Sequence, residues 1–336
     1  MMHTELHAAM LEAVNQEMRL VLSSAGLDPY DGLEELLAYH LGWSNDGQPL
    51  SQGKRIRPLM VLLTTAACGT DWRWALPAAA SVELLHNFSL IHDDIQDQSA
   101  LRRGRETLWS KVGTALAINA GDAMFNLAFI ALTRLSETVP SEITLDAIRI
   151  LQRACIRLTG GQHLDIAYER ADSLPLASYW PMIEGKTAAL LAASAQLGAL
   201  VGGAGPEQQQ AYYQFGFNLG LAFQVWDDCL GIWGDPAVTG KSAASDLLTG
   251  KKTLPVLHGL ERGGPFAQRW KGGPISEADV EEVAALLAAE GSREYSEQEA
   301  HRLTRIALES LDQANPKGEA GERLRALSLS LLDRTH

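Results

Sequence analysis

The chain carries ELLHNFSLIHDDIQD at residues 83–97, an apolar helical pattern that contains three aspartates. Residues four apart lie on one face of a helix, so Asp93 and Asp97 point the same way and Asp94 lies about 100° round the axis. Like charges at this spacing repel unless a cation bridges them. No Lys or Arg lies within four residues of the cluster. The stretch predicts a long helix that holds a hard divalent cation, rather than a solvated acidic helix face.

A second acidic cluster lies in FQVWDDCLG at residues 223–231, where Asp227 and Asp228 sit in another apolar helical run. Carboxylates in apolar surroundings are costly without a cationic partner. Mg²⁺ typically uses one or two carboxylates together with substrate phosphates. Two such clusters therefore indicate an enzyme that binds a metal-diphosphate complex.

The rest of the chain also has helical spacing, and alternating strand patterns with turn signals are absent from the sequence. Leu6, Met10 and Val14 open one amphipathic helix. Further helical runs are expected at 55–68, 77–100, 110–136, 142–170, 178–201, 207–233, 253–261, 276–290, 294–314 and 320–334. We predict an all-α fold with a single domain over residues 1–336, a large helical bundle around a central cavity.

Composition excludes several classes of protein. The formal net charge is −13, which argues against a nucleic-acid partner. The three cysteines, Cys68, Cys155 and Cys229, are far apart and fit a reducing, cytoplasmic location. The N-terminus lacks the pattern of a signal peptide. The run from Thr187 to Gly203 is too short and too weakly apolar for stable membrane insertion, and we expect a close-packed interior helix.

Two basic stretches supply the cations that an acidic enzyme needs for diphosphates. GKRIRP at residues 53–58 precedes an apolar helix, where free backbone N–H groups also attract anions. LRRGR at residues 101–105 follows the first acidic cluster, which suggests a phosphate clamp. His86 lies two helical turns before Asp93 on the same face and could donate to an anion.

Basic residues also surround the second acidic cluster. Lys186 and Thr187 interrupt an apolar run, and a buried lysine needs an anionic partner such as a substrate phosphate. The loop GKSAASD at residues 240–246 carries Lys241 and is followed by Lys251 and Lys252. We expect this loop to close over the diphosphate rather than to form plain surface.

The chain resembles the trans-isoprenyl diphosphate synthases, the polyprenyl synthetase family. The matching strings are GKRIRP (53–58), ELLHNFSLIHDDIQD (83–97), LRRGRETLW (101–109), GQHLDI (161–166), EGKTAALL (184–191), FQVWDDCLG (223–231) and GKSAASDLLTGKKTLP (240–255). They occur in family order. The resemblance implies a helical bundle with a deep cavity, a homodimer, and Mg²⁺-dependent transfer of an allylic group to isopentenyl diphosphate.

The resemblance also implies roles for individual residues. Asp93 and Asp97 would bind two Mg²⁺ ions on the allylic diphosphate, and Asp227, with Asp228, would bind a third. Contacts to the allylic diphosphate would come from Arg102, Lys186, Lys241 and Lys251. Thr187 and Gln224 would lie at the reacting carbon, where Gln224 steadies the carbocation. Isopentenyl diphosphate would be held by Lys54, Arg57, His86 and Arg103. The catalytic set is Asp93, Asp94, Asp97, Lys186, Thr187, Gln224 and Asp227.

The chain departs from the family pattern at one place. The second motif often ends in a third aspartate, and here that position is Gly231, with Asp235 one turn further on. We expect activity to survive, because the family relies mainly on the first aspartate of this motif. The metal affinity is what the departure puts in doubt.

Product length depends on the residues four and five before the first aspartate, which are Ser89 and Phe88. In the family these residues lie beneath the growing tail, and the bulky Phe88 would close the pocket early. We predict a C20 product, geranylgeranyl diphosphate, with C15 farnesyl diphosphate as the alternative. A product of C30 or longer would need small residues at both positions.

Two other functions use similar motifs. A class I terpene cyclase also has DDxxD and three Mg²⁺ ions, but it binds one diphosphate and its second motif differs. A non-catalytic subunit of a heteromeric synthase would usually have lost an aspartate motif. The intact DDIQD disfavours this second alternative, and Gly231 keeps it open.

Overall fold

The computed structural model describes residues 2–43, 53–234 and 244–332, and these residues are overwhelmingly helical. They divide into two compact units, each described separately below. Unit 1 comprises residues 1–151, 196–205 and 317–321, and unit 2 comprises 152–195, 206–316 and 322–336. The expected all-α fold class is confirmed. Helices α7 (Ser141–Glu169), α9 (Ala189–Val201) and α17 (Gly318–Leu332) contribute residues to both units, and the expected single domain stays a prediction.

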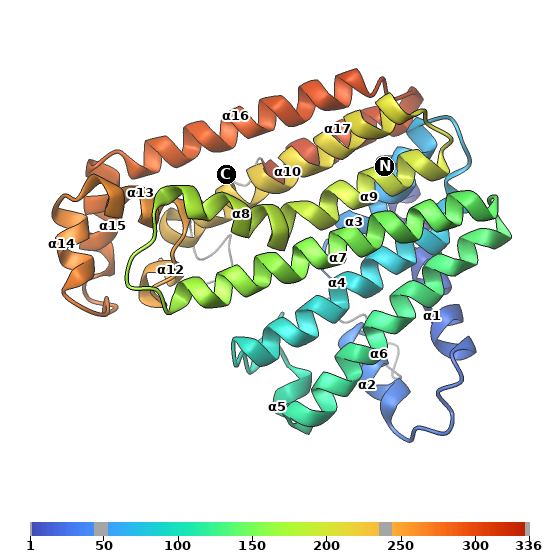
Figure 1. Ribbon diagram of the computed structural model, residues 1–336, viewed down its shortest axis with the longest axis horizontal. Helices are drawn as coiled ribbons and strands as arrows, with labels where there is room; N and C mark the ends of the chain where they lie inside the picture. Colours follow the sequence, from blue (N-terminus) through green and yellow to red (C-terminus); the bar gives the residue numbers. More distant parts are fainter. Residues whose placement is uncertain (1, 44–52, 235–243, 333–336) are drawn as a thin grey trace. The chain divides into compact units, whose positions relative to one another are not determined.

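Unit 1 is built around α4 (Leu76–Gln96), which packs against α6 (Thr114–Thr133), α3 (Ile56–Ala67) and α1 (Met2–Ser24). Figure 1 shows α4 and α6 side by side. Small side chains permit this approach, and Ser81 Oγ on α4 donates to the Ala128 carbonyl on α6 at 2.6 Å. The shorter elements are α2 (Leu33–His40), the 3₁₀ turn η1 (Trp72–Ala75), α5 (Leu108–Val112) and the 3₁₀ turn η2 (Arg134–Glu137).

The expected interior helix is confirmed in α9, where Ala189–Val201 is almost entirely buried. In contrast, the stretch Thr114–Glu137, which contains α6, is only 44% buried in its most apolar window. It is the one helical stretch, among the described residues, that is long and apolar enough to cross a membrane by length and composition. Leu116, Ile118 and Ile130 are exposed on it.

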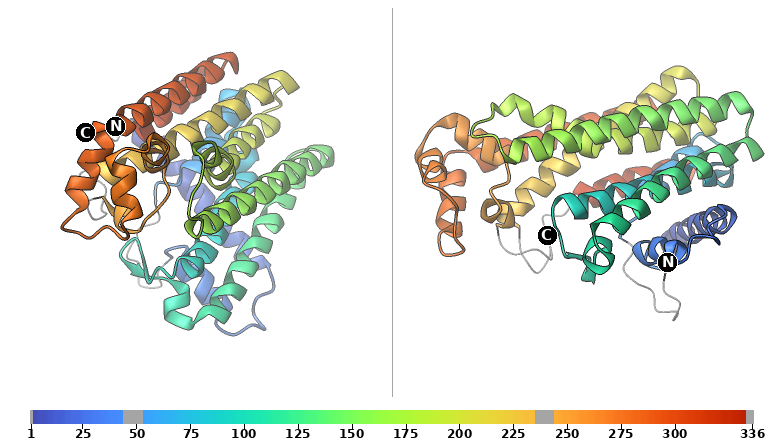
Figure 2. Two further views of the ribbon diagram at one scale, coloured as in Figure 1. Left: turned by 60° about the vertical axis from the view of Figure 1, so that its left-hand side comes forward. Right: turned by 60° about the horizontal axis from the view of Figure 1, so that its bottom comes forward.

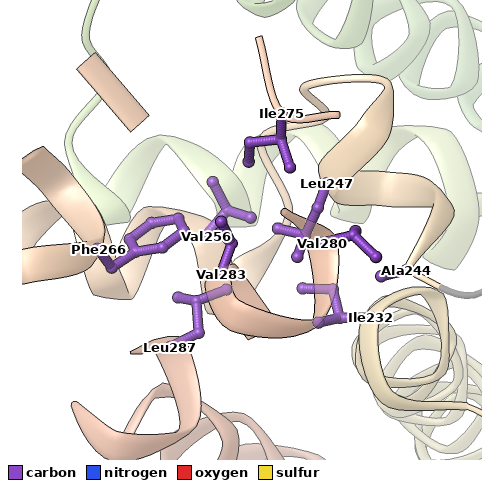
Figure 3. Packing of buried hydrophobic residues seen from close by; sticks show 9 residues of the cluster. All are labelled: Ile232, Ala244, Leu247, Val256, Phe266, Ile275, Val280, Val283 and Leu287. Atoms are coloured by element: carbon purple, nitrogen blue, oxygen red, sulfur yellow. The ribbon is translucent and has the colours of Figure 1, made fainter. Parts of the chain in front are cut away.

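Unit 2 is built around α10 (Pro206–Trp233), which runs beside α16 (Ser292–Gln313) in Figure 1 and in the left view of Figure 2. The remaining elements are the 3₁₀ turn η3 (Leu176–Ser178), α8 (Tyr179–Ile183), the π-helical turn η4 (Glu184–Ala188), α12 (Ser245–Leu248), α13 (Leu254–Arg262), α14 (Pro265–Lys271) and α15 (Val280–Ala289). An apolar cluster joins the end of α10 to α12, α13, α14 and α15, and Figure 3 shows its side chains pointing toward one another.

Three local features differ from the sequence expectations. A two-stranded antiparallel hairpin of β1 (Leu101–Arg102) and β2 (Arg105–Glu106) follows α4, although no strand was predicted. The expected helix 178–201 is interrupted by the π-helical turn at Glu184–Ala188. Helices α2 and α14 were not predicted, because each is short and α14 follows directly after Gly263-Gly264.

Candidate active site

The first acidic cluster lies at the C-terminal end of α4, where Asp97 is the C-cap residue. Asp93 is half-buried and Asp97 is exposed, whereas Asp94 is only 2% exposed. Burial raises the pKa of the Asp94 carboxyl to about 6, against the opposing effect of Arg102. The accessible carboxylates are therefore Asp93 and Asp97, which share one face of the helix as predicted.

The cationic partner of this cluster is Arg102 on β1. Its Nε donates to Asp94 Oδ1 at 2.7 Å, and its Nη2 lies 3.3 Å from Asp93 Oδ2. The hairpin is attached to the end of α4 by Thr107 Oγ1 and Trp109 Nε1, which both donate to the Ser99 carbonyl. Arg102 is thus held in place by Asp94, with Asp93 still accessible from solvent.

The hairpin turn directs the neighbouring arginine elsewhere. Arg103 and Gly104 have φ values of 53° and 76°, the pair of positive values that a tight two-residue hairpin turn requires. The Arg103 guanidinium packs on Gly53, where an added Cβ would lie 2.6 Å from Cζ of Arg103. Arg103 therefore approaches the loop that carries Lys54, whereas Arg102 binds the acidic cluster.

Arg57 and His86 meet beside this loop. Arg57 Nη1 lies 3.4 Å from His86 Nε2, and burial together with Arg57 and Arg103 holds the pKa of His86 well below its ordinary value. A neutral imidazole can still donate one N–H to an anion. Arg55 is different, because its guanidinium turns inward to Asn15 and lies 3.7 Å from Glu83. The structure thus gathers Arg57, His86 and Arg103, and it gives Arg55 a structural role.

The predicted chain-length residues lie one helical turn before the acidic cluster. The Phe88 ring is 4.8 Å from the His92 ring and 4.9 Å from the ring of Phe125 on α6. Phe125 in turn lies 5.2 Å from Phe129. Ser89 donates its hydroxyl to the His86 carbonyl at 2.7 Å. Phe88 is therefore one ring of an aromatic column, and Phe125 was not singled out from the sequence.

The second acidic cluster on α10 is arranged differently. Asp228 is 3% exposed and accepts hydrogen bonds from Tyr179 Oη at 2.6 Å, Gln224 Nε2 at 2.9 Å and the Leu254 N–H at 3.3 Å. Burial raises the pKa of Asp228 to about 6. Asp227 is half-buried. Asp228 is therefore enclosed by protein donors, and Asp227 is the more accessible carboxylate of the two.

Gln224 is fixed at both ends of its amide. Thr187 Oγ1 donates to Gln224 Oε1 at 2.7 Å, while the Gln224 amide nitrogen donates to Asp228. This pattern sets which end of the amide carries the oxygen. Thr187 and Gln224, which were both expected at the reacting carbon, are thus hydrogen-bonded to each other.

Lys186 forms an ion pair with Asp165 on α7. The two meet because α7 and η4 cross closely at two glycines: an added Cβ on Gly161 would lie 2.6 Å from the Gly185 carbonyl carbon. A π-helical turn is frequent at functional sites because it shifts the side-chain register. Asp165 is therefore an anionic partner of Lys186, as the sequence required.

Lys251 lies among carboxylates. Burial opposes its charge, but Asp228, Asp165, Asp246 and Asp227 together raise the pKa of Lys251 well above its usual value. Lys252 is a structural residue, because its Nζ donates to the carbonyls of Tyr168 and Glu169 at the end of α7. Lys241 and Asp235 lie outside the described residues.

A sequence model of the polyprenyl synthetase family matches residues 47–287 of the chain. The chain belongs to the polyprenyl synthetase family. The resemblance expected from the seven motifs is thereby confirmed, and so is the class of enzyme, a prenyltransferase of isoprenoid biosynthesis.

Similar proteins carry two different product names. The (2E,6E)-farnesyl diphosphate synthase of Mycobacterium tuberculosis is 39% identical over 92% of this chain and 87% of its own length. The geranylgeranyl diphosphate synthase of the same organism is 38% identical over 92% of this chain and 90% of its own length. A geranylgeranyl pyrophosphate synthase from Corynebacterium glutamicum, solved with isoprenyl diphosphate and magnesium, is 29% identical with a TM-score of 0.84, over 97% and 98% of the two chains.

The carboxylates of this polyprenyl synthetase fit a divalent metal ion that takes its remaining ligands from water and substrate phosphates. Among the described residues, no three His, Cys, Asp or Glu side chains gather around one point. Each cluster instead offers accessible oxygen ligands on a helix face, Asp93 with Asp97 and, separately, Asp227. Mg²⁺ is usually bound in this way, with water and substrate phosphates completing the octahedron.

Sequence reasoning missed the residues that orient this site. Asp165 and Asp246 stood inside quoted motifs without a role, and Tyr179 and Phe125 stood outside them. The residues that they contact are distant in the sequence. For the two aspartates, the sequence signal was their place inside the motif strings. For the two aromatic residues the sequence carried no signal.

Proposed function

We propose that this prenyltransferase joins isopentenyl diphosphate to an allylic diphosphate, giving a linear trans-prenyl diphosphate and pyrophosphate. The observation that carries the proposal is the separation of Arg102 from Arg103. Arg102 binds the Asp93–Asp94 cluster, while Arg103 lies on Gly53 beside Lys54. An enzyme that joins two prenyl diphosphates must bind two diphosphate groups, so it needs two groups of cations. A cyclase binds one diphosphate and needs one group of cations.

The reaction begins when the allylic C–O bond breaks and its electrons move to the diphosphate. Magnesium bound by Asp93, Asp97 and Asp227, three ions in all, would neutralise the leaving group. Arg102, Lys186 and Lys251 add permanent positive charge. Asp165 orients Lys186, and the carboxylates of the second cluster keep Lys251 protonated.

The allylic cation then reacts with the double bond of isopentenyl diphosphate. The amide oxygen of Gln224 carries partial negative charge, and Thr187 and Asp228 fix its position. We propose that this oxygen steadies the cation until the new C–C bond forms. The released pyrophosphate accepts the proton that restores the double bond, so no histidine or glutamate base is required.

We propose a C20 product, with C15 as the second candidate. Both find support among relatives, which are named for either length. The proposal is supported by the contact of Phe88 on α4 with Phe125 on α6, since Phe88 lies little more than one helical turn before Asp93. A pair of rings closes a pocket more firmly than one, which favours a short product over C30 or longer.

We also propose that the protein is a homodimer in the cytoplasm. Leu116 and Ile130 on α6 are 52% and 42% exposed, and they lie on one side of the helix because they are close to four full turns apart. An exposed apolar helix face is typical of an interface. Sedimentation of wild type and of Leu116→Asp/Ile130→Asp tests this, with Asn126→Asp on the same helix as the control.

The test of the function is a product assay with purified protein. Mg²⁺ and isopentenyl diphosphate are supplied with dimethylallyl, geranyl or farnesyl diphosphate, and the released alcohols are sized by chromatography. A dominant C20 alcohol is expected, and a C15 stop would keep the reaction but change the product. Cyclic hydrocarbons without elongation would identify a cyclase. Binding of both substrates without any product would identify a non-catalytic subunit.

A further inference from the structure

The hairpin of β1 and β2 is a small element that needs support from the rest of unit 1. Its register places Arg105 directly opposite Arg102. A two-stranded hairpin is only marginally stable by itself, and like charges directly opposite each other weaken it further. Arg102 on β1 is drawn to the Asp94 carboxylate. The second strand, β2, therefore needs an attachment of its own.

Tyr39, near the end of α2, supplies that attachment at three points. Its hydroxyl donates to the Glu106 carbonyl at 2.9 Å, and its own carbonyl accepts a hydrogen bond from the Arg105 guanidinium. Its ring centroid lies 4.3 Å from Arg105 Cζ and 5.0 Å from Lys111 Nζ. The face of an aromatic ring attracts cations at such distances. Tyr39 thus holds β2 through its hydroxyl, its ring and its backbone.

The end of α2 also approaches the arginines of the hairpin without adding charge to them. Tyr39 and His40 line the same cavity as Arg102 and Arg103. Burial, with Arg102, Arg103 and Arg105, lowers the pKa of His40 to about 3, so its imidazole is neutral at neutral pH. The hairpin therefore rests against an aromatic ring and a neutral imidazole.

The two arginines nearest the turn depend on this attachment to different degrees. The Arg102 guanidinium lies 2.7 Å from Asp94 Oδ1 and 3.3 Å from Asp93 Oδ2, so α4 holds it directly. Arg103 lies in the turn itself, with a φ of 53°, and its guanidinium packs on Gly53. Its direction follows from the turn, and both strands hold the turn. Loosening β2 would therefore redirect Arg103 more than Arg102.

We propose that Tyr39 is a positioning residue for the isopentenyl diphosphate site. By holding β2, it keeps Arg103 directed at the loop that carries Lys54. This inference rests on the proposed function, in which Arg103 binds isopentenyl diphosphate and Arg102 binds the allylic diphosphate. Tyr39 then governs the affinity for the first substrate and leaves the affinity for the second nearly unchanged.

The test compares Tyr39→Phe, Tyr39→Ala, Arg105→Ala and the double variant Tyr39→Ala/Arg105→Ala with wild type. Tyr30→Ala is the matched control, because Tyr30 precedes α2 and is 62% exposed. Steady-state assays give the KM of each substrate and kcat, and calorimetric titration with isopentenyl diphosphate alone gives its Kd without turnover. Limited digestion with trypsin, which cleaves after arginine, reports the opening of the hairpin in wild type and in the Tyr39 and Tyr30 variants.

Tyr39→Ala should raise the KM and Kd of isopentenyl diphosphate about tenfold, with the allylic KM within about twofold of wild type and kcat within about threefold. Tyr39→Phe keeps the ring and loses the hydroxyl, so the rise should be about threefold. The double variant should be no worse than the weaker-binding single variant, because both side chains act through β2. Trypsin should cleave after Arg103 faster in Tyr39→Ala than in wild type or Tyr30→Ala.

Two results would overturn the proposal. One is an equal rise of both KM values in Tyr39→Ala, because Tyr39 would then only stabilise unit 1 as a whole. The other is an unchanged Kd for isopentenyl diphosphate, even with faster cleavage by trypsin, because the hairpin would then not govern the site. Failure of the proposed function is seen separately, as a wild-type protein that binds isopentenyl diphosphate in the titration but makes no prenyl product.

Discussion

The two acidic clusters stabilise a buried carboxylate with different hydrogen-bond donors. In unit 1 the cluster is partly open, and an arginine from an adjacent hairpin neutralises its buried member, Asp94. In unit 2 the buried member, Asp228, accepts hydrogen bonds from a tyrosine, an amide and a backbone N–H, which are neutral donors, while the charge of Lys251 offsets part of its own. The first cluster is therefore suited to accept metal and anion from solvent. The second is suited to hold a fixed geometry around Gln224.

The largest expected effect comes from removing a carboxylate from the first acidic cluster. Asp93→Ala removes an accessible carboxylate. Among the described residues on that helix face, Asp97 alone can take its place. Turnover should fall by about a thousandfold or more, since charge stabilisation of the leaving group is lost. Steady-state elongation assays would measure it. The melting temperature should stay close to that of wild type, with exposed Asp71→Ala as control, and retained turnover would remove the metal assignment.

The cation-rich surroundings of the open cluster predict an acid sensitivity. Burial, with Arg102, Arg103 and Arg105, lowers the pKa of His40 to about 3. Unfolded His40 gains a proton near pH 6.5 while folded His40 does not, so stability falls as the pH drops below 6.5. At pH 5 the loss from His40 is about 2 kcal/mol. Urea unfolding of wild type and His40→Asn at pH 7.5 and 5 would show it as a smaller loss in the variant.

An equal loss of stability in both proteins would place the acid sensitivity elsewhere. His86 is the second histidine of this region with a lowered pKa. Its own variant, His86→Asn, is therefore the next comparison, although that substitution also tests isopentenyl diphosphate binding through KM.

The second acidic cluster, in which Asp228 accepts hydrogen bonds from neutral donors, should be sensitive to loss of one donor. Tyr179→Phe leaves Asp228 with one hydrogen bond fewer in a buried site, which costs about 1–3 kcal/mol of stability. The turnover number should fall about tenfold while KM changes little, because Asp228, the hydrogen-bond partner of Gln224, is held less firmly. Tyr295→Phe in the same unit is the control. An unchanged turnover number would show that Asp228 does not transmit its position to Gln224.

The smallest energetic effect, but a clear change of product, is expected at the aromatic column. Phe88→Ala should lengthen the product by at least one C5 unit, and Phe125→Ala should do so to a lesser extent. Phe125 acts through Phe88, so the double variant should differ little from Phe88→Ala. Chromatography of the released alcohols measures this. If the Phe125→Ala protein makes the wild-type product, Phe88 alone forms the floor of the product pocket.

The long helices were predictable from spacing alone, because each needs only its own apolar face. The hairpin was not, since strands of two residues carry no alternating pattern, and its turn depends on positive φ at Arg103 and Gly104. The π-helical turn was not predictable either. Gly185 within it meets Gly161, and such a close approach between distant residues leaves no local signal.

The motifs predict roles where the chemistry demands a residue type, and they carry no signal where one side chain orients another. Roles for Asp93, Lys186 and Gln224 were predicted in this way and stay predictions. The partners Asp165 and Tyr179 could not be predicted, because the chain must fold before they meet Lys186 and Asp228. Asp228 illustrates the limit, since its place beside Asp227 suggested a ligand and its burial gives it three protein donors.

The hairpin at 101–106 also bears on how this family can change by insertion. Successive residues of a strand face opposite sides, and a two-residue turn fixes their pairing. One residue added between Arg102 and Gly104 would lengthen the turn and change the side of the hairpin on which Arg103 lies relative to Arg102. The length of this turn therefore sets the direction of Arg103 as much as the residue type does.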